Sequence, residues 1–200
     1  MLEIELFDNC CVVKRQTNET LITLKLCADN DAGVLIAGTN IGFFDHLLKT
    51  FAKYSGLSIE IKEFQADTYV DLHHGVEDMG IVLGIAFRNL FDYNRVARFG
   101  YTIIPMDETL ILSSVDLSGR QYLNFDVDFS ASYIGNFPTE LVEEFFRAFV
   151  NNSAITLHIK KIEGKNNHHI AECTFKSVAL SLRMALRPSE VSFSTKGVIM

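Results

Sequence analysis

The feature that most constrains this chain is an internal repeat, because a duplicated unit decides the whole architecture. The segment FDHLLKTFAKYSGLSIEI at residues 44–61 aligns without a gap with VEEFFRAFVNNSAITLHI at residues 142–159. Further along the chain, HHGVE at residues 73–77 aligns with HHIAE at residues 168–172. The same HHxxE motif therefore occurs once in each half of the chain.

The pattern of apolar residues predicts the same kinds of elements in the two halves. Alternating apolar residues predict strands, and apolar residues at helical spacing predict helices. In the first half we expect strands at 12–14, 21–27 and 57–62, a helix that follows an N-cap at Thr39-Asn40 and stops at Gly56, and a helix at 77–90. In the second half we expect strands at 109–115, 121–128 and 155–161 and helices at 139–151 and 170–186.

This element order predicts the fold class. Each half is a β-β-α-β-α unit, and such a unit buries its helices against one face of its sheet. We therefore expect an α+β fold built by tandem duplication, with two sheets and the four helices packed between them. Residues 1–94 are the expected first structural repeat and residues 95–187 the second, within a single globular unit. Pro188 ends the last helix and leaves a tail at residues 188–200.

The six histidines of the chain all belong to this repeated pattern. Four lie in the HHxxE motifs, His46 lies in the helix before the first motif, and His158 lies in the strand before the second. Residues four apart on a helix share a face, so the first histidine and the glutamate of each motif can bind one ion. The second histidine points about 100° away. Adjacent histidines therefore suit two different metal ions better than one.

Duplication also decides between a metal site and an ordinary helix start. A single His-His pair at a helix start is usually a capped, solvated turn. Solvated turns need no particular residues, so the return of the same three residues in register favours metal binding. We predict two sites of three histidines and one glutamate each, a set that suits Zn, Mn, Fe, Co or Ni. The predicted ligands are His46, His73, His74, Glu77, His158, His168, His169 and Glu172.

Composition limits the class of protein. With 48% hydrophobic and 22% charged residues, the chain lies in the ordinary range of globular domains. Its apolar runs are far shorter than the ~20 residues of a membrane span and its start has no signal-peptide pattern, so we expect a cytoplasmic protein without membrane contact. A net charge of −7 argues against nucleic-acid binding. The four cysteines have no framework-like spacing, and we expect Cys10, Cys11, Cys27 and Cys173 to be reduced.

Several spaced motifs give the chain a family resemblance. The stretches FFDHLLKTFAKYSG, DLHHGVEDMGIVLG, SGRQYLNFDV, LHIKKIEGKNNHHIAECTFK and FSTKGV resemble imidazoleglycerol-phosphate dehydratases of histidine biosynthesis. The resemblance runs from about Val13 to Val198. It implies two manganese ions per active site and a 24-subunit shell with sites between subunits. No phosphatase domain precedes the motifs, so the resemblance implies the monofunctional form.

The resemblance also assigns roles to individual residues. The metal ligands of the family fall on the same eight residues that the duplication selects. The residues that bind the substrate phosphate fall on basic side chains and one serine, partly in the C-terminal tail, and Arg and Lys suit such an anion. These residues are Arg98, Arg120, Lys176, Ser194 and Lys196.

The implied reaction is the dehydration of D-erythro-imidazoleglycerol phosphate to imidazole-acetol phosphate by a metal-dependent hydro-lyase. Two metal ions bound to the ring nitrogens would stabilise an imidazolate, which expels the hydroxide. A carboxylate then takes the proton from the neighbouring carbon. Glu19 in QTNET is the candidate for this base, and Asp107 in PMDE is the second candidate.

Two other classes of protein compete with this interpretation. A dinuclear metallohydrolase normally relies on bridging carboxylates, whereas imidazole dominates this ligand set. A non-catalytic metal-binding or shell-forming protein would explain the histidines but not the four basic residues. Metal-dependent formation of product from the phosphorylated substrate is the test that separates these classes.

Overall fold

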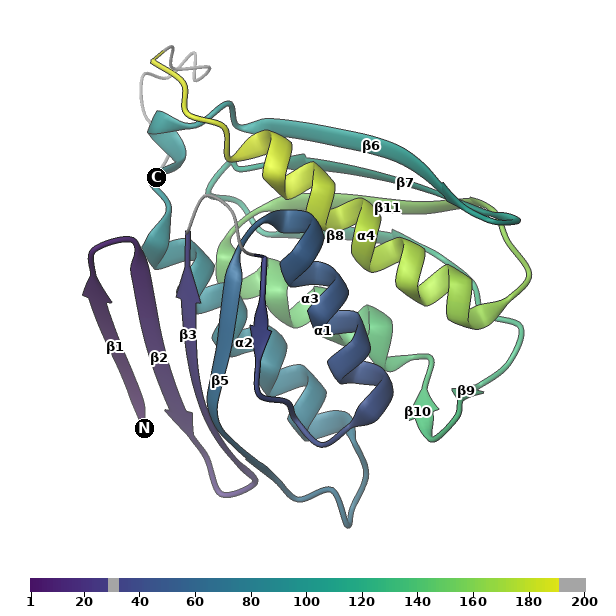
Figure 1. Cartoon of the computed structure of the whole chain (residues 1–200), viewed down its shortest axis with the longest axis horizontal. Coiled ribbons are helices and arrows are strands. Elements are labelled where there is room, and N and C mark those ends of the chain that lie inside the picture. Colours follow the sequence, from purple (N-terminus) through teal and green to yellow (C-terminus); the bar gives the residue numbers. More distant parts are fainter. Residues whose placement is uncertain (29–32, 191–200) are drawn as a thin grey trace.

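The computed structural model describes residues 1–28 and 33–190 of the chain. Two sheets form the outer layers, and the four helices lie between them (Figure 1). The α+β class and the layer order that the repeat predicts are thereby confirmed. Among the described residues, none of the helices combines the length and apolar character that a membrane crossing needs.

The first half forms a five-stranded sheet and two helices. The strands lie in the order β1-β2-β3-β5-β4. They are β1 (Leu2–Phe7), β2 (Cys10–Gln16), β3 (Thr20–Cys27), β4 (Leu35–Ile36) and β5 (Ser58–Ala66). The helices are α1 (Gly42–Ser55) and α2 (His73–Leu90).

The second half forms a four-stranded sheet, a small two-stranded ribbon and two helices. The strands of the sheet lie in the order β6-β7-β11-β8. They are β6 (Phe99–Met106), β7 (Thr109–Asp116), β8 (Tyr122–Asp126) and β11 (Thr156–Glu163), and the ribbon pairs β9 (Tyr133–Ile134) with β10 (Phe137–Pro138). The helices are α3 (Leu141–Ser153) and α4 (Asn167–Ala185), and the short 3₁₀ helix η1 (Tyr93–Arg95) joins the halves.

The two sheets share one topology. The order β2-β3-β5-β4 corresponds to β6-β7-β11-β8, and in each sheet only the last pair, β4 with β5 or β8 with β11, is parallel. The apolar pattern predicted two strands before the first helix of each half and did not indicate β4 or β6. The structure adds these strands, and it adds β1 at the edge of the first sheet.

Helix starts differ from the expected positions. Helix α1 begins at Gly42. Before it, Thr39 donates its N–H and its hydroxyl to the carboxylate of Asp45 in the first turn of the helix. Gly56 ends α1 in the left-handed conformation, as expected for a glycine at this position. Helix α2 begins at His73, four residues earlier than predicted, where the Asp71 carboxylate accepts the His73 N–H at 2.8 Å. The whole HHxxE motif therefore lies within the helix.

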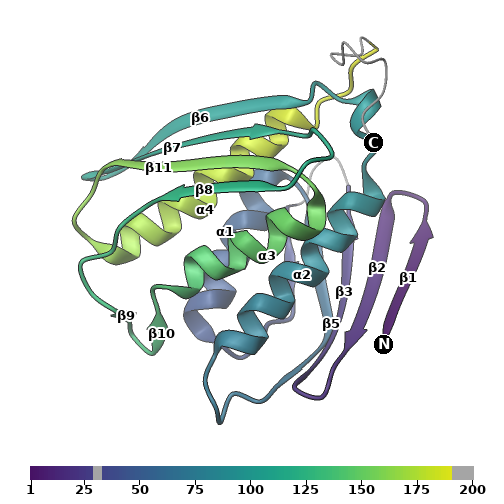
Figure 2. The ribbon, with the colours of Figure 1, turned by 180° about the vertical axis from the view of Figure 1, so that it is seen from behind.

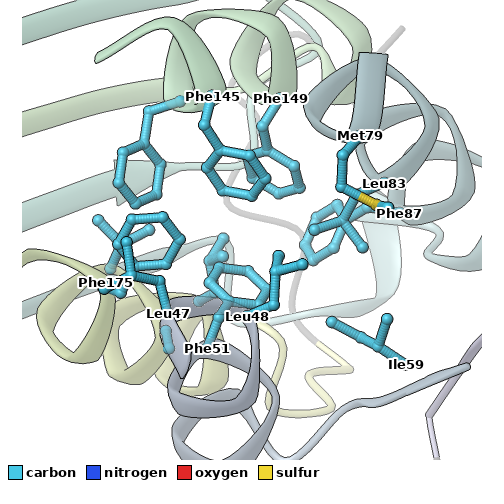
Figure 3. Close-up of a cluster of buried hydrophobic side chains, with 14 of the residues drawn as sticks. Leu47, Leu48, Phe51, Ile59, Met79, Leu83, Phe87, Phe145, Phe149 and Phe175 are labelled. Atoms are coloured by element: carbon cyan, nitrogen blue, oxygen red, sulfur yellow. The ribbon is translucent and has the colours of Figure 1, made fainter. Parts of the chain in front are cut away.

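Aromatic residues from all four helices form the centre of the core. Figure 3 shows Phe51, Phe87, Phe149 and Phe175 converging between the layers. Phe51 and Phe149 occupy equivalent positions in the repeat, and their ring centroids lie 5.9 Å apart. Contact between equivalent residues means that the two halves pack face to face, helix layer against helix layer.

Helices α2 and α3 pack side by side, as seen from behind the molecule (Figure 2). Gly80 and Gly84 lie one turn apart on α2 at this contact. A Cβ at either position would come within 2.6 Å of a carbonyl oxygen of α3, from Phe145 or from Phe149. Only glycine allows the two backbones to approach so closely.

The expectation that all four cysteines are reduced is wrong for two of them. Cys10 and Cys27 form a disulfide across the β2–β3 pair. They are 17 residues apart and meet because the strand register places them opposite each other, which spacing along the sequence did not show. Cys11 and Cys173 are buried free thiols.

This pairing predicts the number of titratable thiols. Under denaturing conditions without reductant, a thiol reagent should modify two cysteines per chain, Cys11 and Cys173. After reduction it should modify four. The native chain should react slowly because both free thiols are buried, and burial raises the pKa of Cys173 to about 11. Four reactive thiols in the unreduced denatured chain would contradict the disulfide.

Candidate metal centre

Three predicted ligands meet where α1 packs against α4. His46 comes from α1, and His168 and Glu172 lie one turn apart on α4. Glu172 Oε2 lies 3.0 Å from His46 Nε2 and 3.2 Å from His168 Nε2. All three ligand atoms lie within 4.8 Å of one another, and we call this group the α1–α4 cluster. Two imidazoles and a carboxylate at this spacing suit a divalent metal ion.

The surroundings of Glu172 keep its carboxylate ionised. Its other oxygen, Oε1, lies 2.7 Å from Lys176 Nζ. Burial alone would raise the pKa of the Glu172 carboxyl, but hydrogen bonds from Lys176 and His46 outweigh burial and lower that pKa to about 2. The carboxylate is therefore ionised at neutral pH. Phe43 packs its ring against His168, with centroids 5.0 Å apart, and so covers one side of the cluster.

In the equivalent pair of the first half, the glutamate is more exposed than Glu172. His73 Nε2 lies 3.7 Å from Glu77 Oε2, and both side chains are about two-fifths exposed. Within each HHxxE motif the two imidazole rings are nearly perpendicular, at 87° for His73 and His74 and 88° for His168 and His169. In each pair the first histidine faces the glutamate of its own motif and the second faces other carboxylates, as helical geometry predicts.

The second histidine of each pair contacts carboxylates instead of its own glutamate. His74 Nδ1 lies 3.0 Å from Asp67 Oδ1 and 3.9 Å from Glu19 Oε2. The hydrogen bond with Asp67 raises the pKa of His74. His169 Nδ1 lies 2.8 Å from Glu108 Oε2, and this bond holds the pKa of Glu108 well below its usual range. The Asp107 carboxylate lies 3.8 Å from His169 Nε2.

His158 does not join the other histidines within one chain. It lies on β11 between Leu157 and Ile159, which are buried, and its own side chain points to the opposite, exposed face. Helix α4 packs on the side of the sheet where the buried residues lie. The sheet therefore separates His158 from the α1–α4 cluster.

The predicted phosphate-binding residues lie at two separate places along α4, one in its middle and one at its C-terminal end. Lys176 lies beside the cluster. The Arg98 N–H donates to the carbonyl of Ala185 at the far end of α4, and the Leu117 N–H donates to the Arg98 carbonyl, three residues before Arg120. Glu172 and Ala185 are 13 residues apart on α4, roughly 20 Å along the helix, so neither arginine reaches the cluster of its own chain. Ser194 and Lys196 lie outside the described residues.

Arg98 is held in place by an acidic partner. Its Nε and one terminal nitrogen bond the two oxygens of Asp116 at 2.6 and 3.0 Å. This paired hydrogen bond raises the pKa of Arg98, which stays cationic. Arg120 follows the turn at Ser118-Gly119 and is exposed.

Candidate base Glu19 lies in the turn between β2 and β3. Its side chain is 55% exposed. The turn borders a cavity of about 390 Å³ that is also lined by Gln65, Ala66, Asp67 and Tyr69. Asp107 lies in the equivalent turn between β6 and β7, with its side chain 77% exposed.

Two partners of the histidines, Asp67 and Glu108, are not among the residues that the sequence pattern predicted for the site. A signal for Glu108 was present, because NETLI at residues 18–22 and DETLI at residues 107–111 are repeat equivalents that extend the duplication toward the N-terminus. No comparable signal marks Asp67, because the connection that carries it differs in length between the halves.

Fold and site together define a duplicated α+β protein with a cluster of two histidines and a glutamate that could hold a metal ion. The family model described as imidazoleglycerol-phosphate dehydratase matches residues 39–182. An imidazoleglycerol-phosphate dehydratase of Thermotoga maritima is 45% identical over 198 residues, which cover 99% of this chain and 100% of that protein. The chain therefore belongs to the imidazoleglycerol-phosphate dehydratase family.

Solved structures agree with this assignment. The crystal structure of imidazoleglycerol-phosphate dehydratase from Staphylococcus aureus superimposes with a TM-score of 0.77 at 40% identity, covering 89% of this chain and 99% of the other. The enzyme from Pyrococcus furiosus gives a TM-score of 0.81 at 38% identity, covering 92% and 99%. Both identities are high enough to support family membership and not only a shared fold.

Proposed function

We propose that this chain dehydrates D-erythro-imidazoleglycerol phosphate to imidazole-acetol phosphate in histidine biosynthesis, as a metal-dependent hydro-lyase. The observation that carries the proposal is the meeting of His46, His168 and Glu172, with ligand atoms within 4.8 Å of one another, in a chain of this family. These residues come from two helices that lie far apart in the sequence.

The proposed metal is Mn²⁺, with two ions in each active site. The eight residues that would hold them are those of the two HHxxE motifs together with His46 and His158. Bound ions would act as Lewis acids toward the imidazole ring of the substrate and lower the pKa of its N–H. Mixed imidazole and carboxylate ligands are compatible with Mn²⁺ but do not select it over Zn or Fe.

Complete sites in this proposal require more than one chain, in a shell of 24 subunits. Support comes from the separation of the predicted residues: the sheet lies between His158 and the α1–α4 cluster, and Arg98 and Arg120 lie at the far end of α4. A neighbouring copy would supply the missing imidazole and the two arginines. Each chain would then place Arg98 and Arg120 in one active site and Lys176 in another.

Exposed apolar side chains also support self-association. Phe99, Tyr101 and Ile103 alternate along the outer face of the edge strand β6 and are 51%, 69% and 56% exposed. On the other sheet, Leu2 and Leu6 of β1 are 52% and 59% exposed. Large exposed apolar side chains that follow one another on one face of a strand are typical of surfaces that contact another protein.

The proposed acid–base chemistry uses Glu19. Its carboxylate is exposed at a cavity and lies 3.9 Å from His74, so it can reach a substrate held by the metal ligands. Such a base would take the proton from the carbon next to the one that loses hydroxide, and the C–H electron pair would form the double bond of the enol, which tautomerises to the ketone. The phosphate of the substrate would be bound by Arg98, Arg120, Lys176, Ser194 and Lys196.

The proposal is tested with the purified chain, Mn²⁺ and imidazoleglycerol phosphate. Product formation, followed as the ketone or its enol, should require the metal and should stop when a chelator is added. Light scattering on the same sample should give a particle of about 24 chains, not one. Absence of metal-dependent product at full metal loading would refute the activity, and a monomer-sized active particle would refute the shell.

A further inference from the structure

We propose that Glu108 and Asp67 are positioning residues that fix the tautomer and orientation of His169 and His74, and that Asp67 thereby leaves the Glu19 carboxylate available for proton transfer. This inference rests on the proposed function. It assigns different roles to Glu19 and Glu108, which occupy equivalent positions in the repeat. Its physical basis is the different set of contacts that each carboxylate makes.

The two acids at the hairpin turns start from equivalent positions. Glu19 precedes Thr20 at the start of β3, and Glu108 precedes Thr109 at the start of β7. Both turns place the glutamate next to the second histidine of the nearby HHxxE motif. The distance from the carboxylate to histidine Nδ1 is 3.9 Å for Glu19 and 2.8 Å for Glu108. Only the second distance is a hydrogen bond.

Glu108 is held by four hydrogen bonds, one of them from the Thr109 hydroxyl to Oε1 at 3.2 Å. Its Oε2 accepts from His169 Nδ1, and its Oε1 accepts the backbone N–H groups of Asn166 and Lys165 at 2.8 and 3.2 Å. These two N–H groups belong to the start of α4, so the carboxylate ties the turn, the helix start and the imidazole together. A carboxylate with both oxygens engaged in this way is poorly placed to move protons on a substrate.

In the first half Asp67 takes over the contact with the histidine. Its two oxygens lie 3.0 and 3.1 Å from His74 Nδ1, and its side chain is 15% exposed. The Asp67 N–H donates to the Glu19 carbonyl at 3.2 Å, which fixes the loop against the turn. Among the described residues, the His74 contact at 3.9 Å is the nearest ionic contact of the Glu19 carboxylate, which stays exposed.

Loop length explains why the two halves differ. Six residues, 67–72, connect β5 with α2, whereas three residues, 164–166, connect β11 with α4. The longer connection begins with Asp67. The shorter one reads Gly-Lys-Asn and contains no acid. His169 therefore contacts Glu108 of the hairpin turn, whereas His74 contacts Asp67 of the connection that leads into its own helix.

The chemical consequence concerns the nitrogen that binds metal. An ionised carboxylate only accepts hydrogen bonds, so the Nδ1 atom facing it must carry the hydrogen. The neutral ring then has its lone pair on Nε2, which is the form that coordinates a cation. Carboxylate partners of this kind orient metal-binding histidines in many proteins, and their loss weakens metal affinity about 10- to 100-fold.

The test compares Glu108→Gln with the matched variant Glu19→Gln. Glutamine has only one side-chain oxygen, which cannot accept hydrogen bonds from the backbone N–H groups and from His169 at the same time. Its NH₂ group must therefore face one of these donors. This disfavours the tautomer of His169 that carries its hydrogen on Nδ1. The metal-free full-length chain is titrated with Mn²⁺ alone in competition with a chelating indicator. We expect Glu108→Gln to weaken at least one Mn²⁺ site about 10- to 100-fold and Glu19→Gln to change no site more than about twofold.

Asp67→Asn supplies the second arm of the test, at His74. It should weaken Mn²⁺ binding by a similar factor, and it keeps the proposal testable if Glu108→Gln fails to fold. Thermal unfolding of the metal-free variants separates positioning from a general structural role, because positioning predicts little change in Tm without metal. Equal Mn²⁺ affinity in Glu108→Gln and the unsubstituted chain, or an equal loss in Glu19→Gln, would overturn the proposal.

The readout also separates this inference from the proposed function. Mn²⁺ affinity is measured without substrate, so a chain that binds Mn²⁺ through positioned histidines but makes no product would refute the dehydratase activity alone. Conversely, the chain could be an active dehydratase whose Mn²⁺ affinity changes in neither Glu108→Gln nor Asp67→Asn. That result would refute the positioning roles alone.

Discussion

Glu19→Gln is expected to lower kcat by about 10²- to 10⁴-fold, the range that a positioned general base contributes. The amide is nearly isosteric with the carboxylate but cannot accept the substrate proton. Because Glu19 makes no hydrogen bond to His74 within the described chain, its loss should leave the bound metal in place. The measurement is turnover at saturating Mn²⁺ and substrate, together with the metal content of the purified variant.

Asp107→Asn is the matched comparison for this result. Asp107 lies in the equivalent turn of the second half, with its carboxylate 3.8 Å from His169 Nε2. If Glu19 is the base, Asp107→Asn should retain far more turnover than Glu19→Gln. Full activity in Glu19→Gln with loss of activity in Asp107→Asn would transfer the role to Asp107.

Glu172→Gln should have the second largest effect, on metal binding. The substitution removes the charge that His46, His168 and Lys176 share, and it places an amide where an anionic ligand is required. Loss of a ligand should exceed the roughly 10- to 100-fold loss that follows removal of a ligand's partner. We therefore expect Mn²⁺ affinity at this site to fall by more than about 100-fold and turnover to fall with it.

Metal analysis of the purified variant, together with Mn²⁺ titration, measures this effect. Glu143→Gln is the control for loss of one negative charge, since Glu143 makes an ion pair with Arg147 on the exposed face of α3 and such pairs contribute little to stability. A second control is the thermal unfolding of the metal-free Glu172→Gln chain, which reports any loss of folding. Normal metal content in Glu172→Gln would remove Glu172 from the ligand set.

Edge strands were the part of the fold that the sequence predicted least well. On β6, the residues that point toward the helices are Gly100, Thr102, Ile104 and Met106, whereas Phe99, Tyr101 and Ile103 point outward. Apolar side chains thus lie on both faces, so the alternation that identifies a half-buried strand is absent. Strand β4 has two residues, too few for any periodicity.

The core helices were predicted well for the opposite reason. Their apolar residues repeat at helical spacing over three or more turns, and the duplication supplied a second copy of each pattern. The same local regularity identified the HHxxE motifs and predicted that the two histidines of each pair diverge. Residues within one helical turn have a fixed relation, so no tertiary information is needed to place them.

By itself, the sequence determined the duplicated architecture and the pairing of each first histidine with the glutamate four residues later, because both follow from local periodicity. Only the tertiary structure decided that His46 of α1 joins His168 and Glu172, that Cys10 pairs with Cys27, and that Glu108 holds His169. These contacts depend on helix packing, strand register and loop length. Such quantities arise from long-range burial of the core and leave no regular spacing along the chain.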